Sequence, residues 1–314
     1  MKIIITGCAG FIGANFTNYW LNRHADDVVV GIDSLTYAAN LRALDELTQR
    51  KNFRFYKTDI CDREGMARIF DCELPELVIN FAAESHVDRS IENSRVFVET
   101  NVLGVQTLLD LCLKYGVKRF HQISTDEVYG DVAIDSDDEF SENSSLNPSS
   151  PYSASKAAAD LLVVSYFKTH NLPVTISRSS NNYGKYQHFE KMIPKTIQNT
   201  QKGEPITVYG DGKNIRDWIY VDDHCRAIEL IVEKGISGGV YNVGGGYSIS
   251  NIQLVREILQ KMGKSDDLIT FVSDRKGHDR KYAMDCSKIE SELGWKAETK
   301  FADGIRKTIA WYNK

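Results

Sequence analysis

The 314-residue chain has no block of lysines or arginines, and none of its apolar runs approaches the ~20 residues that a membrane-spanning helix needs. Its formal net charge is −5. These absences argue against nucleic acid and against a membrane as partners. The N-terminus enters the apolar stretch Lys2 to Thr6 directly, without the layout of a signal peptide. We therefore expect a cytoplasmic protein.

Paired cysteines are also absent. The six cysteines are scattered along the chain, and none of them forms a Cys-x-x-Cys motif. This distribution favours neither a zinc site nor a disulfide framework, so we expect free thiols and no metal. With 42% hydrophobic and 26% charged residues, the composition is that of an ordinary globular protein. The length suffices for two domains or one large α/β unit.

A glycine-rich loop follows the first expected strand, Lys2 to Thr6. Its glycines, Gly7, Gly10 and Gly13, are spaced G-x-x-G-x-x-G rather than the commoner G-x-G-x-x-G, and apolar residues at helical spacing come next. Strand, glycine loop and helix together are the context of a dinucleotide-binding fingerprint. The glycines let the backbone approach a pyrophosphate closely, and the helix N-terminus presents N–H groups to it.

An acidic residue, Asp33, ends the second expected strand, Val28 to Ile32. It lies about twenty residues beyond Gly13, where an acid usually binds the adenosine ribose hydroxyls. A carboxylate there disfavours a 2′-phosphate, and no arginine follows closely. The sequence therefore favours NAD over NADP, with a helix cap as the alternative role for Asp33.

Strands and helices continue to alternate. Further strands are expected at Phe53 to Lys57, Leu77 to Asn80 and Arg119 to Ser124, and a long amphipathic helix at Asn101 to Tyr115. Such alternation implies an α/β fold with a Rossmann-type, doubly wound parallel sheet and helices on both faces.

Two short segments after these strands are candidates for cofactor contact. Asp59-Ile60 follows one strand and can reach the adenine edge. Ala82 and Ala83 follow the next, where small side chains let a cofactor pass close to the sheet. His86 lies just beyond and is equally compatible with a satisfied loop histidine.

The stretch Ser124 to Gly130 carries a hydroxyl, two carboxylates and a phenol directly after an expected strand. Groups at the carboxyl end of a parallel strand lie where open α/β sheets bind ligands. Adjacent Asp126 and Glu127 can divide acid and base work if their environments separate their pKa values. A solvated acidic turn is the alternative interpretation.

A helix opens at Pro151, and Tyr152 and Lys156 lie four residues apart on one face of it. A nearby ammonium favours the phenolate form of a tyrosine. The pair is therefore a candidate proton acceptor for an alcohol that is being oxidised, and the glycine loop upstream favours this role over an ordinary surface pair.

These motifs resemble the extended short-chain dehydrogenase/reductase family, through the glycine loop, Thr125 and Tyr152-x-x-x-Lys156. Within it they are most similar to the dTDP-glucose 4,6-dehydratases, a resemblance that runs through nearly the whole chain. Its most specific element is the adjacent pair Asp126-Glu127, which epimerases of the superfamily do not share. Four other runs carry it as well: Ala83 to Ser90, Arg178 to Gly184, Asp211 to Trp218 and Gly277 to Tyr282.

The resemblance implies a set of site residues. Catalytic residues would be Thr125, Asp126, Glu127, Tyr152 and Lys156. Cofactor-binding residues would be Gly7, Gly10, Phe11, Ile12, Gly13, Asp33, Asp59, Ile60, Ala82, Ala83 and Asn101, with Tyr152 and Lys156. Substrate-binding residues would be Ser85, His86, Asn181, Lys191, Arg216, Asn251, His278, Arg280 and Tyr282. On physical grounds Arg216 and Arg280 can pair with a pyrophosphate, although surface salt bridges are the alternative.

The implied reaction is a redox-neutral dehydration of a nucleotide-activated hexose with bound NAD, by a hydro-lyase of deoxysugar biosynthesis. Tyr152 takes the O4 proton, while Thr125 holds O4 and Lys156 lowers the tyrosine pKa. Glu127 removes the C5 proton, and protonated Asp126 assists loss of the C6 hydroxyl. The resemblance further implies a homodimer that packs through the helices beginning near Asn101 and Tyr152.

Two alternatives remain open. A UDP-sugar 4-epimerase or decarboxylase of the same superfamily would need Tyr152 and Lys156 but not the adjacent carboxylates. A non-catalytic NAD-binding regulator would need none of them. The departures from the family pattern at Lys185, His188, Phe189 and Lys276, together with Cys8 in the glycine loop, leave the nucleotide base and the hexose open.

The expected domains interleave. Residues 1–178, with about 218–243, form the NAD-binding domain, because Tyr241 to Val243 is expected to return to the main sheet. Residues 179–217 and 244–314 form a smaller domain for the nucleotide sugar.

Overall fold

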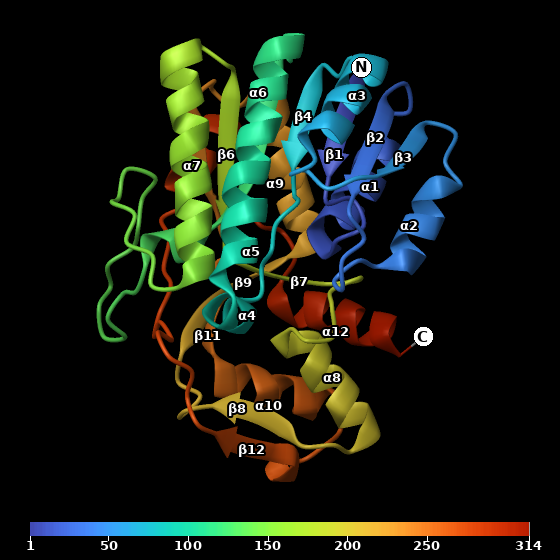
Figure 1. The fold of residues 1–314 in the computed structure, drawn as a ribbon. Coiled ribbons are helices and arrows are strands. Elements are labelled where there is room, and N and C mark those ends of the chain that lie inside the picture. Colours follow the sequence, from blue (N-terminus) through green and yellow to red (C-terminus); the bar gives the residue numbers. More distant parts are fainter. Residues whose placement is uncertain (314) are drawn as a thin grey trace.

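In a computed structural model, which describes residues 1–313, a seven-stranded sheet forms the centre of the molecule (Figure 1). Its strand order is β10-β6-β5-β4-β1-β2-β3, and every neighbouring pair is parallel. The sheet is therefore the Rossmann-type, doubly wound sheet that the alternating sequence pattern predicts. The strands are β1 (Lys2–Thr6), β2 (Val28–Asp33), β3 (Phe53–Lys57), β4 (Leu77–Asn80), β5 (Arg119–Thr125), β6 (Val174–Ser179) and β10 (Gly239–Val243).

Helices cover both faces of this sheet because each face carries a separate apolar core. One core joins the sheet to α3, α6 and α7, and the other joins it to α1, α2 and α9. The strands contribute fully buried β-branched residues to both cores, such as Ile4 to the first and Ile5 to the second. The helices are α1 (Phe11–Arg23), α2 (Leu41–Thr48), α3 (Arg63–Glu73), α6 (Val105–Tyr115), α7 (Pro151–His170) and α9 (Val221–Lys234).

The helix expected at Asn101 to Tyr115 begins earlier and is not uniform. Short helices α4 (Val87–Glu92) and α5 (Ser94–Val98) lead into a π-helical segment, Glu99–Gly104, and then into α6. The continuous stretch Ser94–Tyr115 is long and apolar enough to meet a composition test for a membrane span, but half of its most apolar window is buried inside the protein. It packs against α7 as a core helix of this fold (Figure 1).

A smaller unit lies at the carboxyl ends of the main strands. It contains a three-stranded sheet of β7 (Asn181–Tyr183), β9 (Ile215–Tyr220) and β11 (Ser248–Ser250), and a two-stranded sheet of β8 (Ile206–Tyr209) and β12 (Ile269–Val272). Helices α8 (Met192–Lys202), α10 (Asn251–Lys261) and α12 (Phe301–Tyr312) complete it, with a short 3-10 turn at Asp266–Leu268. Helix α11 (Ser287–Leu293) instead packs against β10 and α9 of the main sheet. The chain returns to the main sheet at β10, beside β6, as expected for Tyr241 to Val243. The exact division into two domains stays a prediction.

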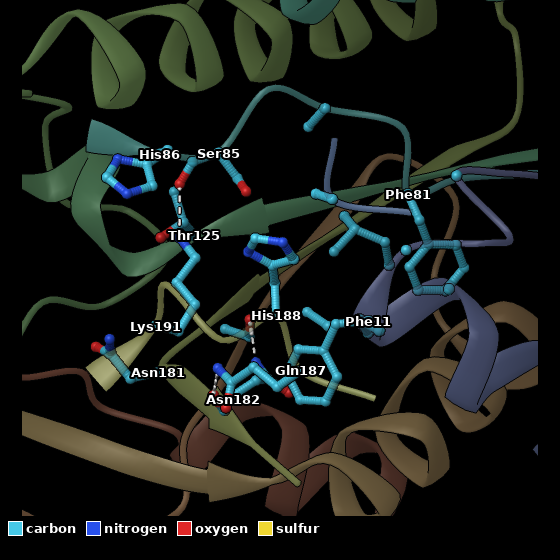
Figure 2. Close-up of a pocket in the computed structure, with 18 of the residues that line it drawn as sticks. Phe11, Phe81, Ser85, His86, Thr125, Asn181, Asn182, Gln187, His188 and Lys191 are labelled. Atoms are coloured by element: carbon cyan, nitrogen blue, oxygen red, sulfur yellow. Dashed lines mark hydrogen bonds between the residues drawn. The ribbon is translucent and has the colours of Figure 1, made fainter. Parts of the chain in front are cut away.

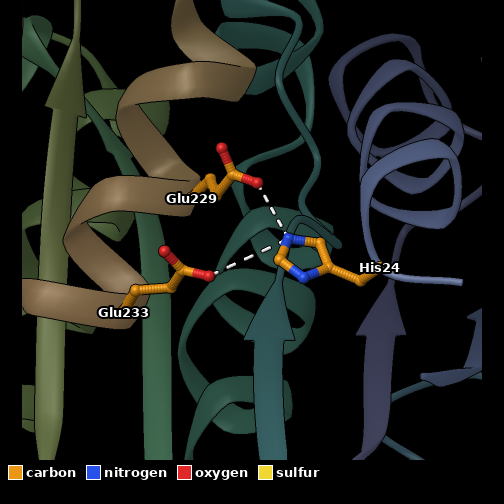
Figure 3. A group of neighbouring side chains, drawn as sticks. All are labelled: His24, Glu229 and Glu233. Atoms are coloured by element: carbon orange, nitrogen blue, oxygen red, sulfur yellow. Dashed lines mark hydrogen bonds and ion pairs between the residues drawn. The ribbon is translucent and has the colours of Figure 1, made fainter. Parts of the chain in front are cut away.

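One cluster of side chains has the spacing of a metal site, but the carboxylate of Glu229 in it already has three partners. His24, Glu229 and Glu233 approach one another between α1 and α9 (Figure 3). Glu229 accepts hydrogen bonds from Tyr19 Oη (2.6 Å) and Arg23 Nε (2.9 Å), and it lies 2.8 Å from His24 Nε2. The cluster thus joins α1 to α9 on one face of the sheet through hydrogen bonds and ion pairs.

Candidate active site

The glycine loop folds as the dinucleotide fingerprint requires. Gly7 has φ +66°, and a Cβ there would lie 2.7 Å from the backbone nitrogen of Ala82. A Cβ at Gly13 would lie 2.1 Å from the carbonyl oxygen of Gly7. Helix α1 then starts at Phe11 without any side-chain cap on its N-terminus. The loop therefore offers uncapped N–H groups and a positive helix end to an anionic group, which fits the diphosphate of NAD.

Asp33 ends β2 next to this loop. Its carboxylate accepts hydrogen bonds from the backbone of Ala9 (2.9 Å) and of Leu35 (2.8 Å). Burial raises the pKa of this carboxyl, and the two backbone donors oppose the shift. Each oxygen keeps a second lone pair for a ribose hydroxyl. Its assignment to the ribose stays a prediction.

One pocket runs along the carboxyl ends of β1, β4, β5 and β6 (Figure 2). It brings together fifteen of the predicted site residues, drawn from segments far apart in the sequence. They are Gly7, Gly10, Phe11, Ile12, Gly13, Ala83, Ser85, His86, Thr125, Asp126, Glu127, Tyr152, Lys156, Asn181 and Lys191. The pocket therefore joins the glycine loop to the expected catalytic groups.

The two carboxylates lie on an irregular turn at the end of β5. Thr125 is the last residue of β5 and caps a 3-10 turn, η2 (Asp126–Tyr129), through a hydrogen bond from Glu127 N to Thr125 Oγ1 (3.3 Å). A regular strand would direct adjacent side chains to opposite faces. The turn instead lets both Asp126 and Glu127 line the pocket.

Their surroundings differ. Burial, and then the charge of Glu127, raise the pKa of Asp126 to about 8. Burial also raises the pKa of Glu127, but three cations oppose that shift: Arg216, Arg275 and Lys191. The environment thus favours a protonated Asp126 beside a Glu127 that cations stabilise in its ionised form, which is the division of roles expected for an acid and a base.

Tyr152 and Lys156 share the buried face of α7, whose first turn Ser150 caps. Lys156 Nζ donates to the carbonyl oxygen of Ile123 (2.6 Å), and burial lowers the pKa of Lys156 to about 8. Burial and the charge of Glu127 raise the pKa of Tyr152 above its ordinary value, whereas Thr125 lowers it. Lys156 is not among the groups that shift the pKa of Tyr152, so the expected lowering by Lys156 is not found in the protein alone.

Several predicted cofactor residues lie outside this pocket. Asn101 is buried, and its amide bonds the backbone of Glu84 and donates to Ser155 Oγ (2.8 Å). It therefore holds the loop after β4 against α7 instead of facing the pocket. The other three make contacts elsewhere. Ala82 donates its N–H to Thr6 Oγ1, and Asp59 accepts a hydrogen bond from Cys61 N. Ile60 packs in the core beside α3 and α6.

The predicted substrate residues divide into two groups. Ser85, His86, Asn181 and Lys191 lie in the pocket, where Lys191 Nζ donates to the carbonyl oxygen of Ser85 (3.0 Å). This bond joins the loop after β4 to the segment before α8 (Figure 2).

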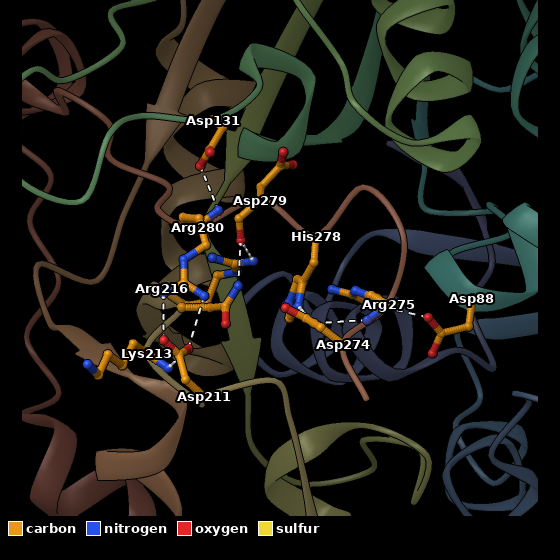
Figure 4. A network of polar contacts seen from close by, with 11 residues as sticks. Asp88, Asp131, Asp211, Lys213, Arg216, Asp274, Arg275, His278, Asp279 and Arg280 are labelled. Carbon is orange, nitrogen blue, oxygen red and sulfur yellow. Dashed lines mark hydrogen bonds and ion pairs between the residues drawn. The ribbon is translucent and has the colours of Figure 1, made fainter. Parts of the chain in front are cut away.

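The second group forms a polar network beside the pocket (Figure 4). Arg280 makes a bidentate salt bridge with Asp211 (3.0 and 3.1 Å). This contact is the alternative to pyrophosphate binding that the sequence left open for Arg280. Arg216 donates to two backbone carbonyls and stacks on the ring of Tyr282, with 4.0 Å from Cζ to the centroid. His278 bonds Asp274, and Asn251 opens α10. Their binding of a nucleotide sugar stays a prediction.

The pocket also contains residues that the sequence analysis did not assign as catalytic or binding residues. They include Tyr37, Phe81, Ser124, Ser180, Asn182, Gln187, His188 and Glu190. Phe81 and Ser180 directly follow strands, and Ser124 is the second-last residue of β5, so the strand-end rule could have found all three. The buried polar atoms of Ser124 Oγ, Ser180 Oγ and Gln187 Oε1 have no partner among residues 1–313 and are available to a ligand.

Glu190 contacts one cation and two imidazole rings from both sides of the pocket. It pairs with Arg89 (2.6 Å), and the rings of His86 and His188 lie 3.6 and 3.7 Å from it. The Arg89 guanidinium in turn stacks on Tyr37, 3.5 Å from the centroid. Loops after β2, β4 and β7 are thereby held together around the pocket.

Comparisons with known proteins agree with this geometry. The family model of GDP-mannose 4,6 dehydratase matches residues 4–308. The dTDP-glucose 4,6-dehydratase of Haemophilus influenzae is 47% identical and covers 99% of this chain and 98% of its own length. The low-salt glycan biosynthesis protein Agl12 of Haloferax volcanii is 48% identical over the same shares.

Among solved structures, DesIV, a dTDP-glucose 4,6-dehydratase of Streptomyces venezuelae crystallised with NAD, superposes with a TM-score of 0.96. It is 44% identical, and the match covers 100% of this chain and 97% of that one.

Proposed function

The chain belongs to the GDP-mannose 4,6-dehydratase family, and we propose that it is a hydro-lyase that dehydrates dTDP-glucose to dTDP-4-keto-6-deoxyglucose with NAD as its cofactor. The single observation that carries the proposal is the pair Asp126 and Glu127 on a turn that faces the pocket. Elimination of water needs an acid and a base that reach neighbouring carbons of the sugar.

The roles of the pair follow from their environments. Glu127, stabilised as an anion by Arg216, Arg275 and Lys191, removes the C5 proton once C4 is a ketone. Asp126, whose pKa of about 8 keeps it protonated at neutral pH, donates a proton to the departing C6 hydroxyl. Addition of a hydride at C6, which bound NADH would supply, and of a proton at C5 would then complete the 6-deoxy product.

Oxidation at C4 requires a different set of groups. Tyr152 accepts the O4 proton, and Thr125, at the end of β5, holds O4 beside it. NAD, when bound, supplies the hydride acceptor at C4 and the donor that later restores C6. The glycine loop, Asp33 and Lys156 would hold it. A positive nicotinamide ring close to Tyr152 would also offset the burial that raises the pKa of its phenol.

We further propose a homodimer. Ile91, Val98, Leu103 and Leu161 expose apolar side chains on α4, α5, the π-helical segment and α7. Figure 1 shows the helices from α4 to α7 together on one side of the molecule. Two copies of this surface would bury it in an isologous contact.

Two further points complete the proposal. We propose the interleaved domains expected from the sequence, with NAD bound by residues 1–178 and about 218–243, and the nucleotide sugar by residues 179–217 and 244–314. A cytoplasmic location is supported by six free cysteines, three of which are buried thiols in the apolar cores.

The test is a panel of dTDP-, UDP-, CDP- and GDP-activated hexoses, assayed for a 4-keto-6-deoxy product. We expect turnover of dTDP-glucose with the highest kcat/KM. A 4-epimer or a pentose as product would favour the epimerase or decarboxylase, and absence of turnover with every hexose would favour a non-catalytic NAD-binding protein. A higher kcat/KM for a hexose on another nucleotide would show that the enzyme prefers a base other than thymine. This comparison is the most informative one, because Lys185, His188 and Phe189 depart from the family pattern.

A further inference from the structure

A buried ion pair lies behind the candidate catalytic turn. Arg178 Nε donates to Asp160 Oδ2 (2.9 Å), and neither side chain is more than 6% exposed. Arg178 Nη1 also donates to Tyr129 Oη (2.9 Å), which donates to Asn242 Oδ1 (2.7 Å). Tyr129 is the last residue of η2, so this network ties the turn of Asp126 to α7, β6 and β10.

Asp160 also lies one helical turn after Lys156 on the buried face of α7. The ammonium of Lys156 bonds a neutral acceptor, the carbonyl oxygen of Ile123. Asp160 Oδ1 is buried and has no hydrogen-bond partner among residues 1–313. It is unfavourable to bury an ammonium without a counter-charge, or a carboxylate oxygen without a hydrogen-bond donor. Asp160 supplies a negative charge to Lys156, and Lys156 supplies a positive charge to Asp160.

We propose that Asp160 is a positioning residue of the active site, which fixes the η2 turn through Arg178 and Tyr129 and supplies the counter-charge of Lys156. It does not touch the pocket, so it acts through these neighbours. Its charge opposes the burial that lowers the pKa of Lys156 to about 8. Without Asp160, the pKa of Lys156 would fall further, and a larger fraction of this side chain would be neutral at neutral pH.

The other charged groups nearby do not replace it. Asp126 and Glu127, on η2, act on the pKa of Tyr152. Burial and Asp160 are the influences that shift the pKa of Lys156. Arg178, on β6, is already paired with Asp160.

The experiment measures the Lys156 titration directly, by NMR of protein with 13C-labelled lysine. The Lys156 signal is identified by its absence in Lys156→Arg. In Asp160→Asn we expect the Lys156 pKa to fall by about one pH unit or more, because removal of a close opposite charge shifts a pKa by that amount. The high-pH limb of the kcat/KM profile should move down with it, and Asp160→Glu should restore both.

Two further variants separate charge from structure. Asp160→Asn/Arg178→Gln removes both charges and so avoids leaving a buried arginine unpaired, and we expect the same fall in the Lys156 pKa. Asp223→Asn is the matched control, because Asp223 is a buried carboxylate that bonds the backbone of Glu298 and Thr299 instead. It should leave the Lys156 titration unchanged.

Tyr129→Phe should reduce kcat without moving the Lys156 pKa, since it loosens the turn but keeps the ion pair. If the Lys156 pKa is the same in wild type, Asp160→Asn and the double variant, the proposal is wrong and Asp160 is only a structural ion pair. This inference relies on the proposed function solely for the consequence of the Lys156 charge. A shifted titration in a protein that dehydrates no sugar would therefore reject the function and leave the electrostatic role of Asp160 standing.

Discussion

At the scale of single residues, the site depends on one protonated carboxyl. Asp126 is buried beside Glu127, and two like charges at this separation are unfavourable. The cations Arg216, Arg275 and Lys191 surround Glu127, so the proton resides on Asp126. Holding this group protonated in the fold has a consequence for stability that can be measured without substrate.

We expect Asp126→Asn to be more stable than the wild type above pH 5. The unfolded carboxyl has a pKa of about 4, whereas the folded one has a pKa of about 8, so between these values the folded state binds more protons. Wild-type stability therefore falls as pH rises from about 4 to about 8. The amide has no proton to lose. Thermal unfolding of both proteins across this range should show that their Tm values diverge toward pH 8. Parallel curves of Tm against pH would contradict the raised pKa of Asp126.

Tyr152→Phe should lower kcat by about 10²–10⁴-fold, because a general base in the transition state contributes roughly that much. Steady-state turnover of dTDP-glucose checks it. Tyr166→Phe is the control, since Tyr166 lies on the same helix but donates to Asp110, outside the pocket. Unchanged kcat in Tyr152→Phe would show that Tyr152 is not the proton acceptor.

Residue identities in the site were readable from the sequence, but their partners were not. The motif around Asp126 and the Tyr152–Lys156 pair both line the pocket as expected. The contact of Arg280 with Asp211, and that of Asn101 with Ser155, join segments that only the folded chain brings together. The direction of the Tyr152 pKa could not be predicted either, because it depends on burial.

At the scale of elements, the glycine loop holds β1 against β4 and α1 (Figure 1). The loop requires glycine at Gly7 and Gly13, because a Cβ at either position would clash with backbone atoms. This gives the loop a structural role that precedes any contact with a cofactor.

We expect Gly7→Ala to lower both thermal stability and NAD affinity. The new Cβ would meet the Phe81–Ala82 backbone at 2.7–2.9 Å, and φ +66° is strained for alanine. Gly116→Ala is the matched control, because Gly116 has φ +64° but open space around it. It carries the strain of about 1 kcal/mol without the clash. Calorimetric Tm and NAD titration should separate the two, and equal losses in both variants would refute the close-packing argument.

Periodicity located most elements, since buried strands and amphipathic helices carry strong patterns. It missed the π-helical segment at Glu99–Gly104, where the expected helix is interrupted. π-helical turns are rare and occur mostly as single turns inside α-helices, so a helical apolar pattern does not predict one. Here the interruption accompanies the bond from Asn101 to Ser155 on α7, which is a tertiary contact.

At the scale of the whole molecule, the sheet order and the return of the chain at β10 place the pocket between the main sheet and the smaller unit. The alternation of strands and helices was sufficient to predict the sheet. It was not sufficient to predict how the loops of Tyr37, Arg89 and Glu190 meet, because that depends on packing between segments.

The exposed apolar surface on α4 to α7 gives a prediction at this scale. Leu103→Glu/Leu161→Glu should convert the proposed dimer to a monomer, because the added charges would be buried in an apolar contact. Ile236→Glu is the control, since Ile236 is equally exposed but lies after α9 on a different surface. Light scattering coupled to gel filtration measures the mass. A wild-type protein that elutes as a monomer, or an unchanged dimer in the double variant, would contradict this interface.

The most direct test of the dehydratase mechanism is one incubation of the wild-type protein with dTDP-glucose in deuterated water, followed by NMR and mass spectrometry of the product. Glu127 must remove the C5 proton, and that position is later reprotonated from solvent-exchangeable groups. We predict dTDP-4-keto-6-deoxyglucose that carries one deuterium at C5. A product that keeps its C6 hydroxyl, or a 6-deoxy product without deuterium at C5, would contradict the assignment of Asp126 and Glu127.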